Sequence, residues 1–129
     1  MKKIIILIPV FNDWDSLMKL LNDINNCIQN IKNYEFYCSV INDSSTTKQP
    51  QILKPNKIKS LNIINMKENR GHARCNAFGI RYINDNETAD YVILMDGDGE
   101  DRPEELNYLV ESISKNPNVS VVAKRIKRS

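Results

Sequence analysis

The sequence predicts an α/β domain with an open, mostly parallel sheet of about five strands and flanking helices. Short runs that are apolar at nearly every position recur along the chain, as is typical of strands buried on both faces of a parallel sheet. Segments with the three-and-four spacing of an amphipathic helix alternate with these runs, which favours parallel strands joined by right-handed crossovers. We expect the strands at residues 3–8, 36–41, 61–66, 91–95 and 119–123.

Helices are predicted between these strands from the spacing of apolar residues. One apolar face runs from 14 to 31, a weaker one from 73 to 80, and a third from 106 to 113. The segment 44–60, rich in lysine and proline, is predicted to be a loop with at most a short helix. With 129 residues and no linker or internal repeat, the chain is expected to form one domain, 1–129.

Composition excludes several classes of protein. The charged share of 26% and the net charge of +2 are ordinary for a globular protein and do not predict nucleic-acid binding. The apolar run at the start is too short for a membrane span, and it lacks the cleavage site of a signal peptide. Three cysteines without a C-x-x-C pair favour reduced, buried thiols and a cytoplasmic location. The basic ending KRIKRS is either a solvated tail or a contact for phosphate or a membrane surface.

Acidic residues crowd together directly after the fourth predicted strand. If the chain stays extended there, Asp96, Asp98 and Glu100 point to the same side. Carboxylates so close together cannot all stay ionised at low cost, and a hard cation such as Mg²⁺ or Mn²⁺ removes the conflict. Gly97 lets a bulky ligand approach the backbone. The sequence therefore predicts a metal site at these three carboxylates.

Two other interpretations of the acidic segment explain less. A helix cap accounts for Asp101 with Glu104, but it does not account for Asp96 and Asp98. A calcium EF-hand is disfavoured because a strand precedes the segment and Asn107 stands where that loop needs a bidentate glutamate.

Polar residues also follow the first two predicted strands. Pro9 is expected to end the first strand, Phe11 to stack on a base, and Asn12 or Asp13 to cap the first helix. Asp43, at the end of the second strand, has two interpretations. Its carboxylate either accepts hydrogen bonds from a nucleobase or makes a turn with the serines and threonines that follow it.

The segment NRGHARCNAFG follows the third predicted strand. Backbone N–H groups at Gly71 and the side chains of Arg70, His72 and Arg74 suit a pyrophosphate at the start of a helix. His72 is the only histidine, and no neighbouring nucleophile suggests a catalytic triad. It is interpreted either as an exposed loop residue or as a phosphate contact.

Five segments in order, IPVFND, VINDSS, NRGHARCNAFGI, VILMDGDGEDRPE and VVAKR, resemble the nucleotide-binding half of family 2 glycosyltransferases. The D-x-D pair alone is a loose pattern, but five segments in the same order are specific, and they span nearly the whole chain. The pattern is most similar to polyprenyl-phosphate sugar transferases of the dolichyl-phosphate mannose synthase type. The resemblance implies a Rossmann-like half of a GT-A fold.

The resemblance also implies roles for individual residues on the nucleoside side. Pro9, Phe11 and Asp13 fall on a P-x-Y-N-E pattern that contacts the nucleoside, with phenylalanine in place of tyrosine and aspartate in place of glutamate. Asp43 falls on the aspartate that reads the base.

On the phosphate side, the resemblance implies a metal and diphosphate site. Asp96 and Asp98 fall on the aspartates that hold the metal and the diphosphate, and they are the residues expected to be catalytic. Glu100 falls where the subgroup usually carries glutamine. Arg125 falls on a basic residue near phosphate, and Lys124 replaces the usual small residue beside it.

The implied reaction is metal-dependent transfer of a sugar from a UDP- or GDP-type nucleotide-diphosphate sugar to a lipid phosphate or a glycan, at the cytoplasmic face of a membrane. The portion that supplies the acceptor site in this family would follow Ser129, so we expect a truncated, donor-binding half. The alternative is a noncatalytic module that binds a nucleotide sugar or a metal and works with another chain. A nucleotidyltransferase is disfavoured because PVFND replaces its glycine-rich loop.

Overall fold

All five strands lie in one parallel sheet. The computed structural model describes residues 1–96, 105–115 and, through the backbone alone, 121–123. The strand order is β3-β2-β1-β4-β5, and every neighbouring pair is parallel, as predicted. The strands are β1 (Lys2–Val10), β2 (Tyr34–Asn42), β3 (Ile58–Asn65), β4 (Tyr91–Leu94) and β5 (Val121–Ala123).

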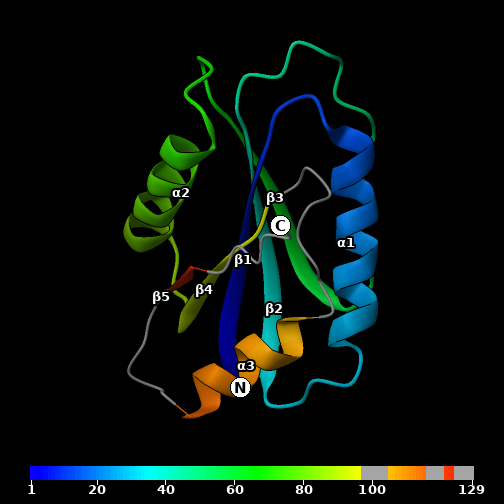
Figure 1. Ribbon diagram of the computed structural model, residues 1–129, viewed down its shortest axis with the longest axis vertical. Coiled ribbons are helices and arrows are strands. Elements are labelled where there is room, and N and C mark those ends of the chain that lie inside the picture. The colour runs from blue at the N-terminus through cyan, green and yellow to red at the C-terminus, as the bar shows by residue number, and fades with distance from the viewer. Residues whose placement is uncertain (97–104, 116–120, 124–129) are drawn as a thin grey trace, which may run out of the picture.

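Helices cover both faces of the sheet. Helix α1 (Trp14–Ile28) and helix α3 (Leu106–Lys115) pack on one face, while α2 (His72–Asn86) packs on the other (Figure 1). Each face has its own apolar cluster, so the domain has three layers. The three helices match the three predicted from apolar spacing, although α1 ends at Ile28 rather than at residue 31.

Strand β1 is the centre of the core. Its residues Ile4 to Ile8 are 0% exposed, because β2 and β4 flank the strand and helices cover both of its faces. Alternate residues of β1 belong to the two apolar clusters. Ile4, Ile6 and Ile8 face α1 and α3. Ile5 and Leu7 face α2. The unbroken apolar run of β1 therefore reflects burial on both faces.

Two local predictions are corrected by the structure. The segment 44–60 is a loop only as far as residue 57, because β3 begins at Ile58 and no helix precedes it. Pro9 does not end the first strand, which continues to Val10 with Pro9 opposite Ile41. Leu7 accepts a hydrogen bond from Met95 on the β4 side, and Pro9, two residues on, faces the same side. The pairing with β4 stops at Leu7, so the missing N–H of Pro9 interrupts no ladder bond.

The strand order puts a topological switch point next to β1. The chain passes from β1 outward through β2 to β3, then returns to place β4 on the other side of β1. In open α/β sheets, ligands bind at the carboxyl ends of the strands beside such a reversal. Within the described residues, no helix is long and apolar enough to cross a membrane.

Candidate functional site

Asp43 joins the end of β2 to the turn that precedes α2. Its side chain is 1% exposed, and its two carboxylate oxygens accept hydrogen bonds from the backbone N–H of Arg70 at 2.7 Å and of Gly71 at 2.9 Å. Asn69 donates to the backbone carbonyl of Asp43 at 3.2 Å. A buried carboxylate needs such partners, and here they come from residues almost thirty positions away in the chain. The turn is therefore fixed to the sheet.

A thiol is the third donor to this carboxylate. Cys75, buried on the first turn of α2, is hydrogen-bonded to Asp43. Burial first, and then the hydrogen bond and negative charge of Asp43, raise the pKa of Cys75 from 9.0 to about 12. The thiol thus stays protonated and donates. Cys38 is buried in the sheet, and burial raises its pKa to about 12 as well. All three cysteines are free, but only Cys38 and Cys75 are buried as predicted, since Cys27 is half-buried.

Gly71 is required by the backbone of the turn. It occupies the N-cap position of α2 with φ of 87° and ψ of 156°, a region that is essentially restricted to glycine. A Cβ added there would meet no atom within 4 Å, so the requirement is conformational and not steric. The position predicted for a helix start after a glycine turn is confirmed.

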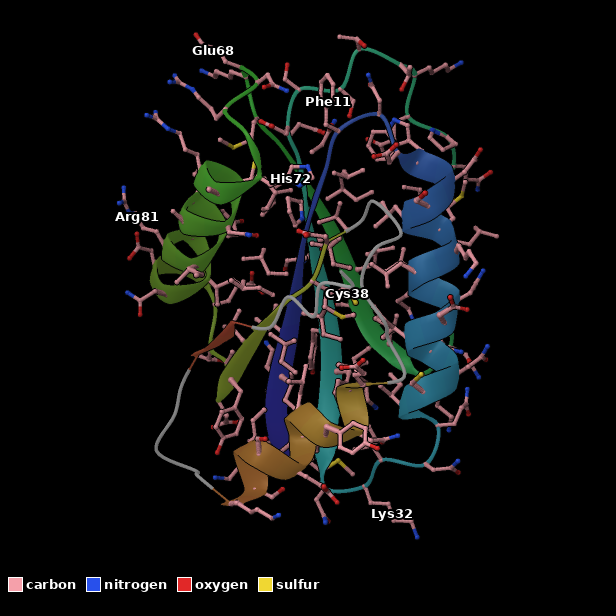
Figure 2. All side chains as sticks on the ribbon, viewed as in Figure 1. Phe11, Lys32, Cys38, Glu68, His72 and Arg81 are labelled. Carbon is pink, nitrogen blue, oxygen red and sulfur yellow. The ribbon has the colours of Figure 1, made fainter. Side chains whose placement is uncertain are left out.

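Asp96 and His72 approach each other from β4 and α2. Asp96 lies two residues beyond the end of β4 and is 3% exposed. The Nδ1 atom of His72 lies 4.0 Å from the Oδ1 atom of Asp96, and the imidazole is about one-third exposed at 36%. Figure 2 shows His72 between the start of α2 and the sheet, near the strand ends that also carry Phe11. Asp43, Asp96 and His72 therefore lie at the same edge of the sheet.

The loop after β1 is tied to the loop after β2. Asn12, with φ of 63°, accepts hydrogen bonds through Oδ1 from the backbone N–H of Thr46 and Thr47 at 2.8 and 3.0 Å. Asn42 accepts from the N–H and the hydroxyl of Ser45 at 3.0 and 2.6 Å. These bonds fix the two loops that border the carboxyl ends of β1 and β2.

Two local expectations at these loops change as a result. Asp13 holds the N-cap position of α1, but neither it nor Asn12 makes a side-chain cap hydrogen bond, since Asn12 is occupied by the second loop. The turn with the following hydroxyls is made by Asn42, not by Asp43. The carboxylate of Asp43 is committed to the α2 turn instead.

The other predicted residues on the described part of the chain surround this edge. Phe11 is half-buried in the loop after β1, and Arg74 is exposed on the first turn of α2. Arg70 pairs with Glu68 at 2.8 Å on the surface. A hollow of about 390 Å³ lies beside the end of β3, lined by Asn65, Met66, Lys67, Glu68, Arg70 and Phe78. Its lining includes neither Asp43 nor Asp96.

Several predicted site residues lie outside the described residues. These are Gly97, Asp98, Glu100 and Arg125, together with the expected cap at Asp101 and Glu104. Within the described residues, no group of three or more His, Cys, Asp or Glu side chains is placed to hold a metal ion. Asp96 and His72 are two such side chains that approach each other, with 4.0 Å between Nδ1 and Oδ1.

Sequence reasoning missed the approach of His72 to Asp96. The two residues are 24 positions apart, and nothing in either local pattern links them. The order of the predicted elements was the signal that could have found it. His72 and Asp96 each follow a strand and stand before or at the start of a helix, so a parallel sheet puts both residues at its carboxyl edge. Which strands are neighbours decides the distance, and the sequence pattern does not contain that information.

An open parallel sheet whose strand order reverses beside β1 is the architecture of doubly wound α/β domains, which bind ligands at that reversal. The family profile of Glycosyl transferase family 2 matches residues 5–129, and the chain belongs to that family. The chain is therefore a glycosyltransferase by resemblance, and members of this family commonly use a divalent metal ion. The resemblance to the dolichyl-phosphate mannose synthase subgroup is not part of that finding.

Solved structures from S. aureus share the fold. Crystal structures of TarS and of TarS 1-349 each superpose with a TM-score of 0.64 at 22% sequence identity over 88% of this chain. The chain spans 20% of the first structure and 32% of the second. At this identity the likeness shows the fold alone.

Proposed function

We propose that this chain carries the donor-binding half of a metal-dependent glycosyltransferase that uses a nucleotide-diphosphate sugar. The observation that supports it most directly is the burial of Asp96 at the end of β4, beside the reversal of strand order and next to His72. In open α/β sheets, ligands bind at this edge, beside the reversal of strand order. A carboxylate placed there is suited to a ligand that carries phosphate together with a cation.

The proposal gives the two sides of the edge different tasks. Phe11 and Asp13, with Pro9 behind them, line the nucleoside end, where Phe11 offers a ring for stacking on the base. Asp43 serves this end by fixing the turn at Arg70 and Gly71, and reading a base N–H would require one of its oxygens to exchange a turn hydrogen bond for one from the base. The side chain proposed to read the base is therefore the same one that holds the turn before α2.

The diphosphate end is proposed at the start of α2 and after β4. Gly71 and Arg74 present a backbone N–H and a guanidinium there, which suits phosphate oxygens. Asp96, Asp98 and Glu100 would hold Mg²⁺ or Mn²⁺, Gly97 would let the diphosphate approach the backbone, and Arg125 would lie near phosphate. The ion, when bound, neutralises the charge that grows on the leaving nucleoside diphosphate.

The acceptor is proposed to be a polyprenyl phosphate, as in the dolichyl-phosphate mannose synthase type, or a glycan. An anionic phosphate acceptor needs no general base, whereas a hydroxyl acceptor does. A lipid acceptor would bring the basic ending KRIKRS to the cytoplasmic surface of a membrane, where anionic lipid attracts lysine and arginine.

Calorimetry tests the donor site directly. UDP and GDP sugars are titrated into the chain with and without Mn²⁺, and we expect binding that requires the metal. Asp98→Ala should weaken that binding by at least about tenfold, because it removes a carboxylate ligand. Equal binding of metal and nucleotide by the parent and by Asp98→Ala would contradict the assignment.

A second candidate function is a noncatalytic donor-binding module that works with another chain. Metal-dependent binding is expected under both candidates. Release of the free sugar or its transfer to an acceptor, followed by chromatography, is expected only for the enzyme.

A further inference from the structure

The gap between His72 and Asp96 has a length that suits a shared cation. Their closest nitrogen and oxygen atoms are 4.0 Å apart, beyond the roughly 3.2 Å limit of a direct hydrogen bond. Two ligands of one metal ion, each bound at about 2.1 Å, can be separated by at most about 4.2 Å. The observed distance falls between these limits. Cis ligands of an octahedral ion lie about 3.0 Å apart, so the two atoms would have to approach each other by about 1 Å when the ion binds.

We propose that His72 is a ligand of the same divalent cation as Asp96, so that this donor site holds its metal through nitrogen as well as oxygen. The inference rests on the proposed function, because the ion is the one that would accompany the nucleotide diphosphate. It assigns the role of the only histidine in the chain.

His72 is held where this role needs it. It is the first residue of α2 and follows Gly71, whose N–H is bound by the buried carboxylate of Asp43. Cys75, one turn further, is bound by the same carboxylate, and its own N–H donates to the carbonyl of Gly71 at 3.0 Å. The backbone on both sides of His72 is therefore fixed to β2, and a ligand on a fixed backbone loses little entropy when it binds a metal.

Asp96 is fixed from the opposite side of the gap. The preceding residue, Met95, donates its N–H to the carbonyl of Leu7 at 3.0 Å and is buried at 4% exposure. This bond continues the β4 ladder onto the central strand β1. The two proposed ligands thus stand on separate rigid elements, α2 and β4, and the gap between them is set by the sheet.

A nitrogen ligand changes which metal the site prefers. Imidazole suits Co²⁺ and Zn²⁺ better than Mg²⁺, which prefers oxygen. A site with His72 as ligand should therefore bind Co²⁺ more tightly than Mg²⁺ in the presence of nucleotide. Removal of the imidazole should reduce the difference between the affinities of the site for Co²⁺ and for Mg²⁺.

The competing explanation is a simple ion pair between a protonated imidazole and the carboxylate. An arginine at position 72 keeps a positive charge but cannot bind a metal, because it lacks a free lone pair. Because the arginine repels a cation beside Asp96 under either explanation, the ¹⁵N coupling to bound Mn²⁺ separates the two explanations, and His72→Ala removes both. The imidazole is about one-third exposed, so neither change should prevent folding, which circular dichroism checks.

The test uses the untagged chain with Mn²⁺ and either UDP or GDP. Metal affinity is measured by calorimetry for the parent, His72→Ala and His72→Arg, with Arg81→Ala as a control on the outer side of α2 (Figure 2). Electron spin echo envelope modulation of bound Mn²⁺ is recorded with ¹⁵N-histidine protein and unlabelled nucleotide. Only one residue in the chain can give a ¹⁵N coupling.

We expect ¹⁵N coupling in the parent, its loss in both His72 variants, and at least about tenfold weaker Mn²⁺ binding in both. Arg81→Ala should match the parent. If the parent binds Mn²⁺ with nucleotide but shows no ¹⁵N coupling, or if His72→Arg keeps parental affinity, the inference fails and the proposed function stands. If the parent binds no metal with either nucleotide, both fail.

Discussion

Asp43 connects three parts of the chain through one carboxylate. It follows β2, accepts from the turn before α2, and is bound by the thiol of Cys75 within that helix. The sequence predicts either a nucleobase contact or a turn with the following hydroxyls at this position. It does not predict the partners, which come from a segment across the sheet.

Asp43→Asn tests the value of this connection. The amide keeps the size of the side chain but offers one oxygen, so one of the two N–H groups of Arg70 and Gly71 would face an NH₂ group. We expect the free energy of unfolding to fall by about 1–3 kcal/mol. Urea denaturation measures it.

The matched control is Asp85→Asn, at an exposed position on α2. It should change the free energy of unfolding by less than about 0.5 kcal/mol. An equally small change for Asp43→Asn would mean that the carboxylate does not hold the turn.

Helix α2 packs on β1 at very short range. A Cβ built on Gly79 would lie 2.6 and 2.7 Å from the two terminal carbons of Leu7, which is 0% exposed. Because Leu7 is enclosed by the sheet and the helix, it cannot move away easily. Gly79 therefore sets how closely α2, and with it the turn that carries His72, approaches the sheet.

Gly79→Ala should destabilise the domain in spite of the better helix propensity of alanine. Overpacking typically costs about 1–3 kcal/mol, and the gain in propensity is about 1 kcal/mol, so we expect a net loss of up to about 2 kcal/mol. Thermal or urea unfolding measures the change. Adding Leu7→Val, which shortens the facing side chain, should recover part of the loss. If the changes in the free energy of unfolding caused by Gly79→Ala and by Leu7→Val simply add in the double variant, the proposed contact is contradicted.

The elements themselves were largely predictable, because each depends on local pattern. The five strands and three helices appear where apolar runs and amphipathic spacing indicate them. Two errors came from tertiary context. Pro9 continues β1 because its missing N–H faces a side where β4 has already stopped pairing, and β3 begins at Ile58 because β2 offers a partner there, with Ile58 opposite Phe36.

At the scale of the whole molecule, the buried thiols link stability to pH. The pKa values of Cys38 and Cys75 are raised in the folded state from 9.0 to about 12. Unfolded thiols lose their protons near pH 9, whereas the folded ones keep them until about pH 12. Their contribution is therefore complete below pH 9 and is lost as the pH rises from 9 towards 12.

We expect the free energy of unfolding to fall between pH 8.5 and pH 10.5, as measured by urea denaturation at several pH values. Lysines and tyrosines titrate in the same range, so the comparison is with Cys38→Ala and Cys75→Ala. Both variants should start from a lower stability, because they leave cavities, but should lose stability less steeply with pH. If the free energy of unfolding falls equally steeply with pH in the parent and in both variants, the raised pKa values of the thiols are contradicted.

The sequence by itself determined the α/β class, the approximate bounds of the strands and helices, and the family to which the chain belongs. These follow from periodicity and from residues close together in the chain. Only the tertiary structure decided that β4 returns to the far side of β1, that Asp43 holds the turn before α2, and that His72 stands 4.0 Å from Asp96. Such distances depend on which strands become neighbours, and that choice is made by the packing of the whole sheet and its helices.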